Sequence, residues 1–146
     1  MPTYCVTSPA GCIPDAARNR IARDITRIHH EQTGAPSFFA QTFFHDIPAG
    51  SYFLGGEKLE SDQIFVCGHI RAGRSTETKN RMMIQMVDAM ASATGLPPNR
   101  IWVYIVDVPA AQMAEFGRIL PEPGAEADWV ARLDPRDRER MQAEAA

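Results

Sequence analysis

The sequence predicts an α/β fold in which two tandem β-α-β repeats form a four-stranded sheet with two helices on one face. Three observations lead to this prediction. The chain has 146 residues, a length that suits a single domain with a core of its own. Strand-like and helix-like segments alternate as strand, helix, strand, twice over. The second half also matches the first when the chain is shifted by 61 positions.

The first repeat covers about residues 2–56. It begins with a strand at 3–7, where β-branched and aromatic residues dominate, and continues with a helix at about 14–32. Residues 38–46 indicate a long strand, and the Pro- and Gly-rich segment 47–61 indicates a connection with a short strand or β-arm. The apolar side of the helix is marked by isoleucines at helical spacing, namely Ile13, Ile21, Ile25 and Ile28.

The second repeat covers about residues 62–120 and follows the same order. A buried strand is predicted at 63–70, a helix at 76–94 and another strand at 100–106. The apolar side of this helix carries Met82, Met83, Met86, Val87 and Met90.

The match between the halves is free of gaps. Six residues recur as the identical residue after 61 positions, and these are Thr33, Gly34, Pro36, Asp46, Pro48 and Ala49. Right-handed crossovers place both helices on the same face of the sheet, which leaves the other face bare. Because the strands are strongly apolar, we expect that face to be covered by other subunits.

Composition excludes several classes of function. The net charge is −3, with 15 basic and 18 acidic residues, so the chain carries no basic footprint for nucleic acid or a membrane surface. No stretch is long and apolar enough to span a bilayer or serve as a signal peptide, so we expect a cytoplasmic protein. Three cysteines without paired spacing favour reduced thiols over a disulfide framework or a zinc site.

The tail from about residue 121 is expected to be partly helical, docked through Trp129 and Leu133, and frayed at 142–146.

Pro2 is the first candidate for chemistry. Proline is a secondary amine only at a chain terminus, and removal of Met1 would expose that amine. Because Pro2 leads directly into a predicted core strand, its amine would be held in place, where burial and neighbouring charge can tune its pKa. Many chains begin with Met-Pro without any function for the proline, so the position of the strand is the informative observation.

Two arginines and a histidine are candidates for binding an anion. Arg71 and Arg74 follow the third strand, and Gly73 between them permits a tight bend, so their planar guanidinium groups can converge on one carboxylate. His29 and its neighbour His30 lie near the end of the first helix, where the helix C-terminus favours the protonated imidazole. Solvated loop arginines and a capping histidine are the structural alternatives.

Tyr104 and Glu115 complete the set of candidate residues. Tyr104 lies in an apolar strand and is expected to be a buried phenol that needs a partner. Glu115 is either a surface charge or a base. No third ligand at a suitable spacing accompanies the histidines, so no metal site is predicted.

Several of these segments together resemble the tautomerase superfamily, and within it cis-3-chloroacrylic acid dehalogenase and its homologues. The segments are Pro2 at the start of a strand, GHIRAGRS at 68–75, IWVYIVDVPA at 101–110 and QMAEFGRILPEPG at 112–124. The likeness runs from residue 2 to about 133. It implies a homotrimer with one Pro2 site in each subunit.

The resemblance also implies roles for individual residues. Pro2 matches the N-terminal proline of the family. Arg71 and Arg74 match the arginines that bind the substrate carboxylate, and His29 matches the histidine that assists them. Tyr104 and Glu115 match the pair that activates water.

The implied function is cofactor-free hydration of 3-haloacrylates such as cis-3-chloroacrylate, or of related α,β-unsaturated acids, with some tautomerase activity. The implied partner is a small carboxylate substrate. Two alternatives stay open. The first is a keto-enol tautomerase of the phenylpyruvate type, which needs a neutral Pro2 amine, and the second is a non-catalytic binding protein of the same fold.

Overall fold

The computed structural model describes residues 2–144 and contains a mixed four-stranded sheet in the order β2-β1-β5-β6. Strand β1 (Thr3–Pro9) pairs in parallel with β2 (Gln41–Ile47), and β5 (Ile64–Arg71) pairs in parallel with β6 (Ile101–Val108). The two pairs meet at the centre, where β1 and β5 are antiparallel. The predicted α/β class and the four-stranded sheet are confirmed.

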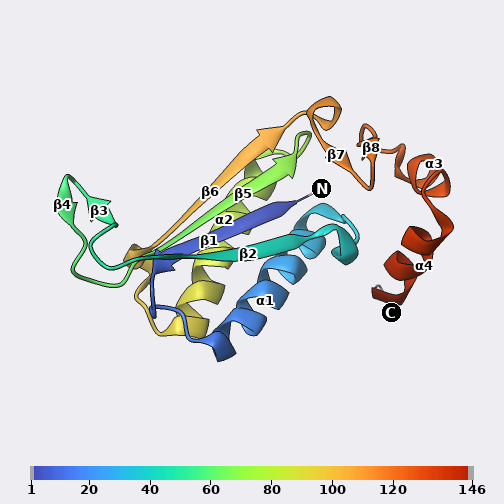
Figure 1. Cartoon of the computed structure of the whole chain (residues 1–146). Coiled ribbons are helices and arrows are strands. Elements are labelled where there is room, and N and C mark those ends of the chain that lie inside the picture. The colour runs from blue at the N-terminus through green and yellow to red at the C-terminus, as the bar shows by residue number, and fades with distance from the viewer. Residues whose placement is uncertain (1, 145–146) are drawn as a thin grey trace.

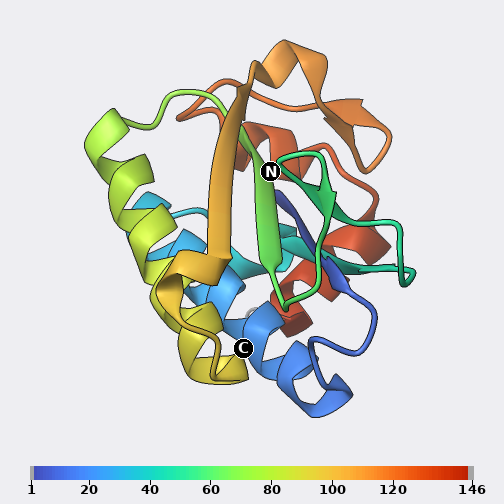
Figure 2. The same ribbon diagram turned by 90° about the vertical axis from the view of Figure 1, so that its left-hand side faces the viewer.

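Two long helices cover one face of this sheet. Helix α1 (Asp15–Thr33) and helix α2 (Thr76–Thr94) lie side by side on the same face (Figures 1 and 2), as predicted. Each ends at a glycine in the left-handed conformation, Gly34 with φ 72° and Gly95 with φ 77°. Glycine adopts this conformation without the steric cost that a Cβ imposes, which explains why both helices end where they do.

The main core lies between the helices and the sheet. The helical residues on the predicted apolar sides pack there, and β1 and β5 contribute alternate residues. The fully buried members of this core include Tyr4, Val6, Ile21, Ile25, Ile64, Val66, Met82, Met86 and Met90.

The structural elements recur at the same interval of 61 residues as the sequence. The 3-10 helix η1 (Ser37–Phe39) corresponds to η2 (Pro98–Arg100). The β-hairpins also correspond, and these are β3 (Phe53–Leu54) with β4 (Glu57–Lys58), and β7 (Ala114–Glu115) with β8 (Arg118–Ile119). Because the central strands are antiparallel, the two hairpins lie at opposite ends of the sheet (Figure 1).

The C-terminal segment forms a second, smaller core. After η3 (Ala110–Gln112) and the β7-β8 hairpin, the chain continues into α3 (Glu126–Ala131) and α4 (Pro135–Glu144). The second core is built from Phe39, Ala110, Leu120, Trp129, Leu133 and Met141. The predicted anchors Trp129 and Leu133 and the partly helical tail are therefore confirmed.

Two local predictions were wrong. The strand predicted at 38–46 begins only at Gln41, because Ser37–Phe39 turns as a 3-10 helix after Pro36 and places Phe39 in the second core. Fraying was predicted from residue 142, but helix α4 continues to Glu144. The last two residues of that predicted segment lie outside the described residues.

The sheet face opposite the helices is bare and carries large apolar and aromatic side chains. Those on the edge strands β2 and β6 are exposed, and they include Phe43, Trp102, Tyr104 and Val106. Tyr104 is 54% exposed and packs edge to face against Phe65. The expectation of a buried Tyr104 is thus wrong for the single chain, because no element within residues 2–144 covers its ring.

None of the helices in residues 2–144 is long and apolar enough to cross a membrane. The three cysteines are free thiols.

Candidate active site

The topology gathers most of the predicted site residues at one end of the sheet. Strand β1 begins where the antiparallel β5 ends, with Thr3 opposite His69, and β6 ends beside β5, with Val108 next to Arg71. The segments that follow β5 and β6 therefore leave the sheet next to the start of β1. Figure 1 shows the N-terminus at this end.

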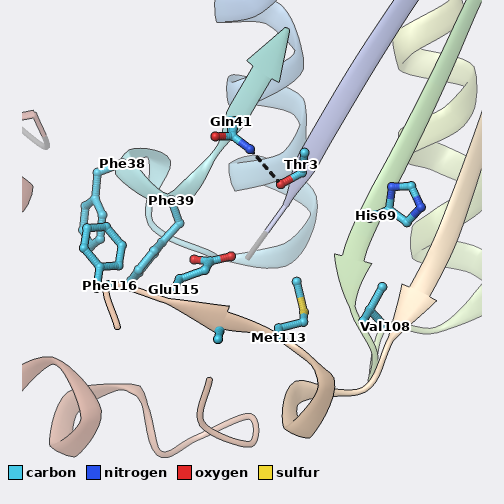
Figure 3. A pocket seen from close by; sticks show the side chains of 10 residues that line it. Thr3, Phe38, Phe39, Gln41, His69, Val108, Met113, Glu115 and Phe116 are labelled. Atoms are coloured by element: carbon cyan, nitrogen blue, oxygen red, sulfur yellow. Dashed lines mark hydrogen bonds between the residues drawn. The ribbon is translucent and has the colours of Figure 1, made fainter. Parts of the chain in front are cut away.

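A cavity of about 570 Å³ opens at this end and is called the site cavity below. It is lined from β1, β2, β5, β6, η1 and the β7-β8 hairpin (Figure 3), and its lining residues are Thr3, Phe38, Phe39, Gln41, His69, Val108, Met113, Ala114, Glu115 and Phe116. Glu115 contributes the carboxylate of this set, beside an aromatic wall of Phe38, Phe39 and Phe116. The cavity therefore combines one acid with an apolar surface.

Pro2 lies beside the site cavity. It is buried, and its carbonyl oxygen accepts a hydrogen bond of 3.0 Å from the backbone nitrogen of Gln41. Its neighbour Thr3 lines the cavity together with Glu115. An amine on Pro2 would therefore be held at the cavity by the same backbone hydrogen bonds that build the sheet.

A narrow crevice, called the carboxylate crevice below, is lined by His29, Ala35, Arg71 and Arg74. Its free volume is only about 10 Å³, close to the least that admits one water molecule. The bend that brings the two arginines together has Gly73 at φ 113°, a conformation that L side chains rarely adopt. The structure thus brings His29, Arg71 and Arg74 together, as the sequence predicted for an anion site.

His29 is neutral in this environment. Burial, together with the nearby Arg74 charge, lowers the pKa of His29 from its ordinary value of 6.5 to about 4. The expectation that the helix C-terminus would favour protonated imidazole is wrong for His29, because loss of hydration opposes the charge more strongly. At neutral pH His29 is therefore uncharged and adds no positive charge to the crevice.

His30 has a different role. It is exposed, and its Nδ1 donates a hydrogen bond of 2.8 Å to the carbonyl oxygen of Ala35. His30 therefore fastens the loop after α1, which is the structural alternative considered for a helix-end histidine.

Tyr104 is the one predicted site residue that the chain does not bring to the site. It lies in the middle of β6, opposite Cys67, and its ring is on the bare face of the sheet. It lines neither the site cavity nor the carboxylate crevice.

The sequence reasoning missed two residues that contact the carboxylate crevice. The first is Tyr4, whose hydroxyl is 2.8 Å from Nδ1 of His29. A buried tyrosine needs a hydrogen-bond partner. Tyr4 is two residues after Pro2 and therefore on the same face of the strand, and this spacing could have indicated that it lies near the site. The second is Glu126 of α3, whose Oε1 is 2.5 Å from Arg71 Nη2. No sequence pattern connects residues that are 55 positions apart and in different kinds of element.

Comparisons with known proteins agree with this arrangement. Residues 1–133 match the model of a family described as putative oxalocrotonate tautomerase enzymes. The crystal structure of N1, a member of the cis-3-chloroacrylic acid dehalogenase family, is 33% identical with a TM-score of 0.90, covering 97% of this chain and 99% of that one. The structure of native Ps01740 is 30% identical with a TM-score of 0.73, covering 77% of this chain and 99% of that one.

More distant structures share the fold. A native fused 4-OT is 24% identical with a TM-score of 0.74, covering 80% of this chain and 94% of that one. The F6 fused 4-OT, which forms an asymmetric trimer, is 22% identical with the same TM-score, and 80% of this chain and 94% of that chain are covered. A comparison with curated proteins finds no match. With a family match over nearly its whole length, the chain belongs to the tautomerase superfamily, in the branch that resembles cis-3-chloroacrylic acid dehalogenase.

Proposed function

We propose that the protein is a cofactor-free hydratase that adds water to cis-3-chloroacrylate or a related α,β-unsaturated acid, with Pro2 as its N-terminal amine. The observation that carries the proposal is the shared position of three features at one end of the sheet. These are the start of β1, the Glu115 carboxylate and the crevice that contains the arginines.

Substrate binding follows from the carboxylate crevice. Arg74 and the free donors of Arg71 bind the carboxylate, and neutral His29 adds a hydrogen bond. Hydrogen bonds to the carboxylate withdraw electron density from the double bond, and C3 becomes electrophilic. The crevice thus holds one end of the acid while its double bond extends toward Pro2 and Glu115.

The chemical step needs a base that activates water for attack on C3 and an acid that protonates C2. Glu115 takes a proton from a water molecule as the water oxygen bonds to C3, and cationic Pro2 gives its proton to C2. With cis-3-chloroacrylate the product is 3-chloro-3-hydroxypropanoate. This halohydrin loses HCl to give malonate semialdehyde, so the overall reaction consumes one water molecule and releases one halide.

We further propose a homotrimer in which the bare sheet face is covered by neighbouring subunits. The exposed aromatic residues on β2 and β6 support this proposal, because a soluble protein rarely leaves such a surface in water. Tyr104 lies on that face and not at its own cavity, so in the trimer it would reach the site of a neighbour and help Glu115 to orient water.

Keto-enol tautomerisation is the second candidate, favoured by the arginines near the amine. Two nearby cations stabilise the neutral form of Pro2, which moves a proton between the oxygen and the carbon of an enol such as that of phenylpyruvate. The ion pair between Arg71 and Glu126 offsets part of the arginine charge, so the Pro2 amine keeps its proton more readily. Because hydration needs the cationic amine, we propose hydration as the main activity.

The test is a substrate panel on protein whose loss of Met1 has been verified by mass spectrometry. Cis- and trans-3-chloroacrylate, an acetylenic acid and the enol of phenylpyruvate are incubated with the protein, with halide release and enol absorbance as readouts. We expect halide from cis-3-chloroacrylate and a slower loss of enol. Absence of both reactions would favour the non-catalytic alternative.

The variant Glu115→Gln separates the two chemistries. It removes the base that activates water but leaves the amine, so hydration should fall by roughly 10²-fold or more while tautomerisation is largely kept. An equal loss of both activities would contradict the assignment of Glu115 to water.

A further inference from the structure

Arg71 is already engaged by the C-terminal segment. Its Nη1 donates a hydrogen bond of 2.8 Å to the carbonyl oxygen of Pro121, and its Nη2 donates one of 2.5 Å to Oε1 of Glu126. The other carboxylate oxygen of Glu126 accepts a bond of 2.8 Å from the backbone nitrogen of Gly124. The Arg71 side chain is only 6% exposed and that of Glu126 is 34% exposed, so the pair is shielded on the arginine side.

This engagement leaves Arg71 able to contact a ligand. A guanidinium group has five N–H donors, and the two bonds to the tail use two of them. Arg71 still lines the carboxylate crevice with His29 and Arg74. The bonds to Pro121 and Glu126 therefore orient the guanidinium plane and keep part of its donor set directed at the crevice.

The ion pair also determines the charge of the crevice. Glu126 compensates Arg71, and the Arg71 guanidinium in turn lowers the pKa of the Glu126 carboxyl, so the pair stays ionised at neutral pH. His29 is uncharged at neutral pH. Within residues 2–144, Arg74 makes no ion pair with a carboxylate, although the Glu126 charge acts on it as well as on Arg71. Arg71, Arg74 and Glu126 together thus give the crevice one net positive charge.

We propose that Glu126 is a positioning residue that orients Arg71 and limits the crevice to one net positive charge, so that the site selects monocarboxylates over dicarboxylates. This inference rests on the proposed function only in taking the crevice as the place where a substrate carboxylate binds. A second carboxylate would enter a region where the crevice residues offer no further uncompensated positive charge, and its loss of hydration would not be offset.

The geometry argues against a role in which the Glu126 carboxylate blocks the crevice and is displaced by the substrate. The tail holds Arg71 through a backbone carbonyl as well as a carboxylate, and a substrate cannot displace the former without moving the chain. The tail itself is fixed, because Trp129 donates a 2.7 Å hydrogen bond to the Ile119 carbonyl oxygen and is buried in the second core. Glu126 is therefore a built-in part of the site.

The test compares the affinities of two small probes, propanoate and malonate, in the wild type, Glu126→Gln and the matched control Glu122→Gln. A glutamine at position 126 can still accept a hydrogen bond from Arg71 but carries no charge, and Glu122 is an exposed acid on the same segment. Binding is followed by NMR through the His29 imidazole signals, so no turnover is required. We expect Glu126→Gln to raise the affinity for malonate relative to propanoate by roughly five- to tenfold, the effect of one added charge at partly solvated distance.

The outcomes separate the two proposals. If the wild type binds neither probe at His29, the crevice is not a carboxylate site and the proposed function falls together with this inference. If propanoate binds but the malonate-to-propanoate ratio is the same in Glu126→Gln and Glu122→Gln, the role of Glu126 alone is overturned. Glu126→Asp tests orientation, since it keeps the charge but shortens the side chain; it should keep the wild-type ratio while binding both probes more weakly, and a ratio like that of Glu126→Gln would overturn the charge argument.

Discussion

The Tyr4 hydroxyl and Nδ1 of His29 are 2.8 Å apart in the interior, and this hydrogen bond fixes which nitrogen of the imidazole carries the proton. Burial raises the pKa of the Tyr4 phenol well above its ordinary value, so the phenol keeps its proton and donates it. If Nδ1 were the donor instead, the phenol hydrogen would be buried without an acceptor, which is costly. His29 therefore accepts at Nδ1 and carries its own proton on Nε2.

Tyr4→Phe should weaken substrate binding through His29. Without the phenol, Nδ1 loses its donor, and the imidazole is free to exchange tautomers and orientations. We expect kcat/KM for the carboxylate substrate to fall by roughly tenfold and the protein to lose about 1 kcal/mol of stability. Nitrogen NMR shifts of His29 should change from the Nε2–H pattern to a mixture. Tyr52→Phe, which removes a phenol far from this pair, is the control, and an unchanged His29 spectrum in Tyr4→Phe would refute the positioning role.

Gly68→Ala should destabilise the sheet through Tyr4. A Cβ on Gly68 would overlap Cε1 and Cδ1 of the Tyr4 ring, at distances much shorter than carbon atoms approach. Since β5 is a central strand and the ring is fully buried, neither side can move easily. We expect a loss of about 2–3 kcal/mol in urea unfolding at a fixed protein concentration. The same change in a Tyr4→Leu background should cost much less, and equal costs in both backgrounds would show that Tyr4 is not the obstacle.

The pH dependence of His29 follows from its lowered pKa. Because its folded-state pKa of about 4 is below the unfolded value of 6.5, the unfolded chain binds this proton more tightly. His29 therefore causes no loss of stability above about pH 6.5, and an increasing loss as the pH falls from about 6.5 to about 4. The imidazole carbon-bound proton signals should stay at their neutral positions down to about pH 5. His29→Gln should lose less stability than the wild type over this range, and a His29 midpoint near 6.5 would contradict the burial argument.

Mixing two inactive variants tests whether Tyr104 serves a neighbouring subunit. Tyr104→Phe and Glu115→Gln are each expected to be poor hydratases. If Tyr104 acts across the interface, random mixed trimers contain sites with an intact Glu115 and a neighbour's intact Tyr104, and activity should recover to roughly one quarter of the wild type. Each variant unfolded and refolded alone is the control. If no activity is recovered after verified subunit exchange, Tyr104 and Glu115 either serve the same site within one subunit or do not share a site at all.

Phe116 is a further test of the cavity wall. Its φ of 52° is in the left-handed region, where the equivalent residue of the first repeat is Gly55 with φ 64°. A bulky residue in this conformation costs about 1 kcal/mol or more, which its contacts with Phe39 and Trp129 offset. Phe116→Gly should relieve the backbone strain but widen the site cavity. We expect kcat/KM for the phenylpyruvate enol to rise relative to cis-3-chloroacrylate, with Phe53→Gly on the opposite hairpin as control; an unchanged ratio would exclude Phe116 from substrate selection.

The elements that the sequence predicted correctly are those whose signals are local. Ile21, Ile25, Met82 and Met86 repeat at helical spacing and are all fully buried, since one face of each helix packs on the sheet. The 61-residue recurrence identified both halves for the same reason, because equivalent positions do the same packing. Residues whose position depends on a local turn of the chain were harder to predict. Phe39 is in an aromatic segment typical of a strand, but the chain turns there as a 3-10 helix after Pro36, and Phe39 packs in the second core.

Interactions that depend on distant segments left no signal in the sequence. The bond between Arg71 and Glu126 exists because the tail folds back over the end of β5. The tail contains no repeat or motif that predicts this contact. The protonation of His29 also depended on burial, which outweighed the helix terminus that the sequence shows. Tyr104 is exposed because no element within residues 2–144 covers that face of the sheet, and the sequence of one chain does not state whether a neighbouring subunit covers it.

The recurrence of elements every 61 residues has a chemical consequence for the end of the sheet opposite the site. The second-repeat equivalent of Pro2 is Gln63, which is buried in the chain interior. Residues equivalent to Arg71, Arg74, His29 and Glu115 are Ala10, Ile13, Met90 and Leu54.

An internal proline is an amide and has no basic nitrogen, so a reactive amine was never available at the position of Gln63 once two repeats shared one chain. The charged partners of such an amine would then be unpaired ions with no task, and apolar residues such as Ile13 and Met90 fill the core better. The two repeats of this chain therefore cannot carry the same proline chemistry. If Pro2 is the reactive amine, as we propose, the first repeat holds the reaction centre at the one position where a proline can be a secondary amine, and the second repeat serves as its scaffold.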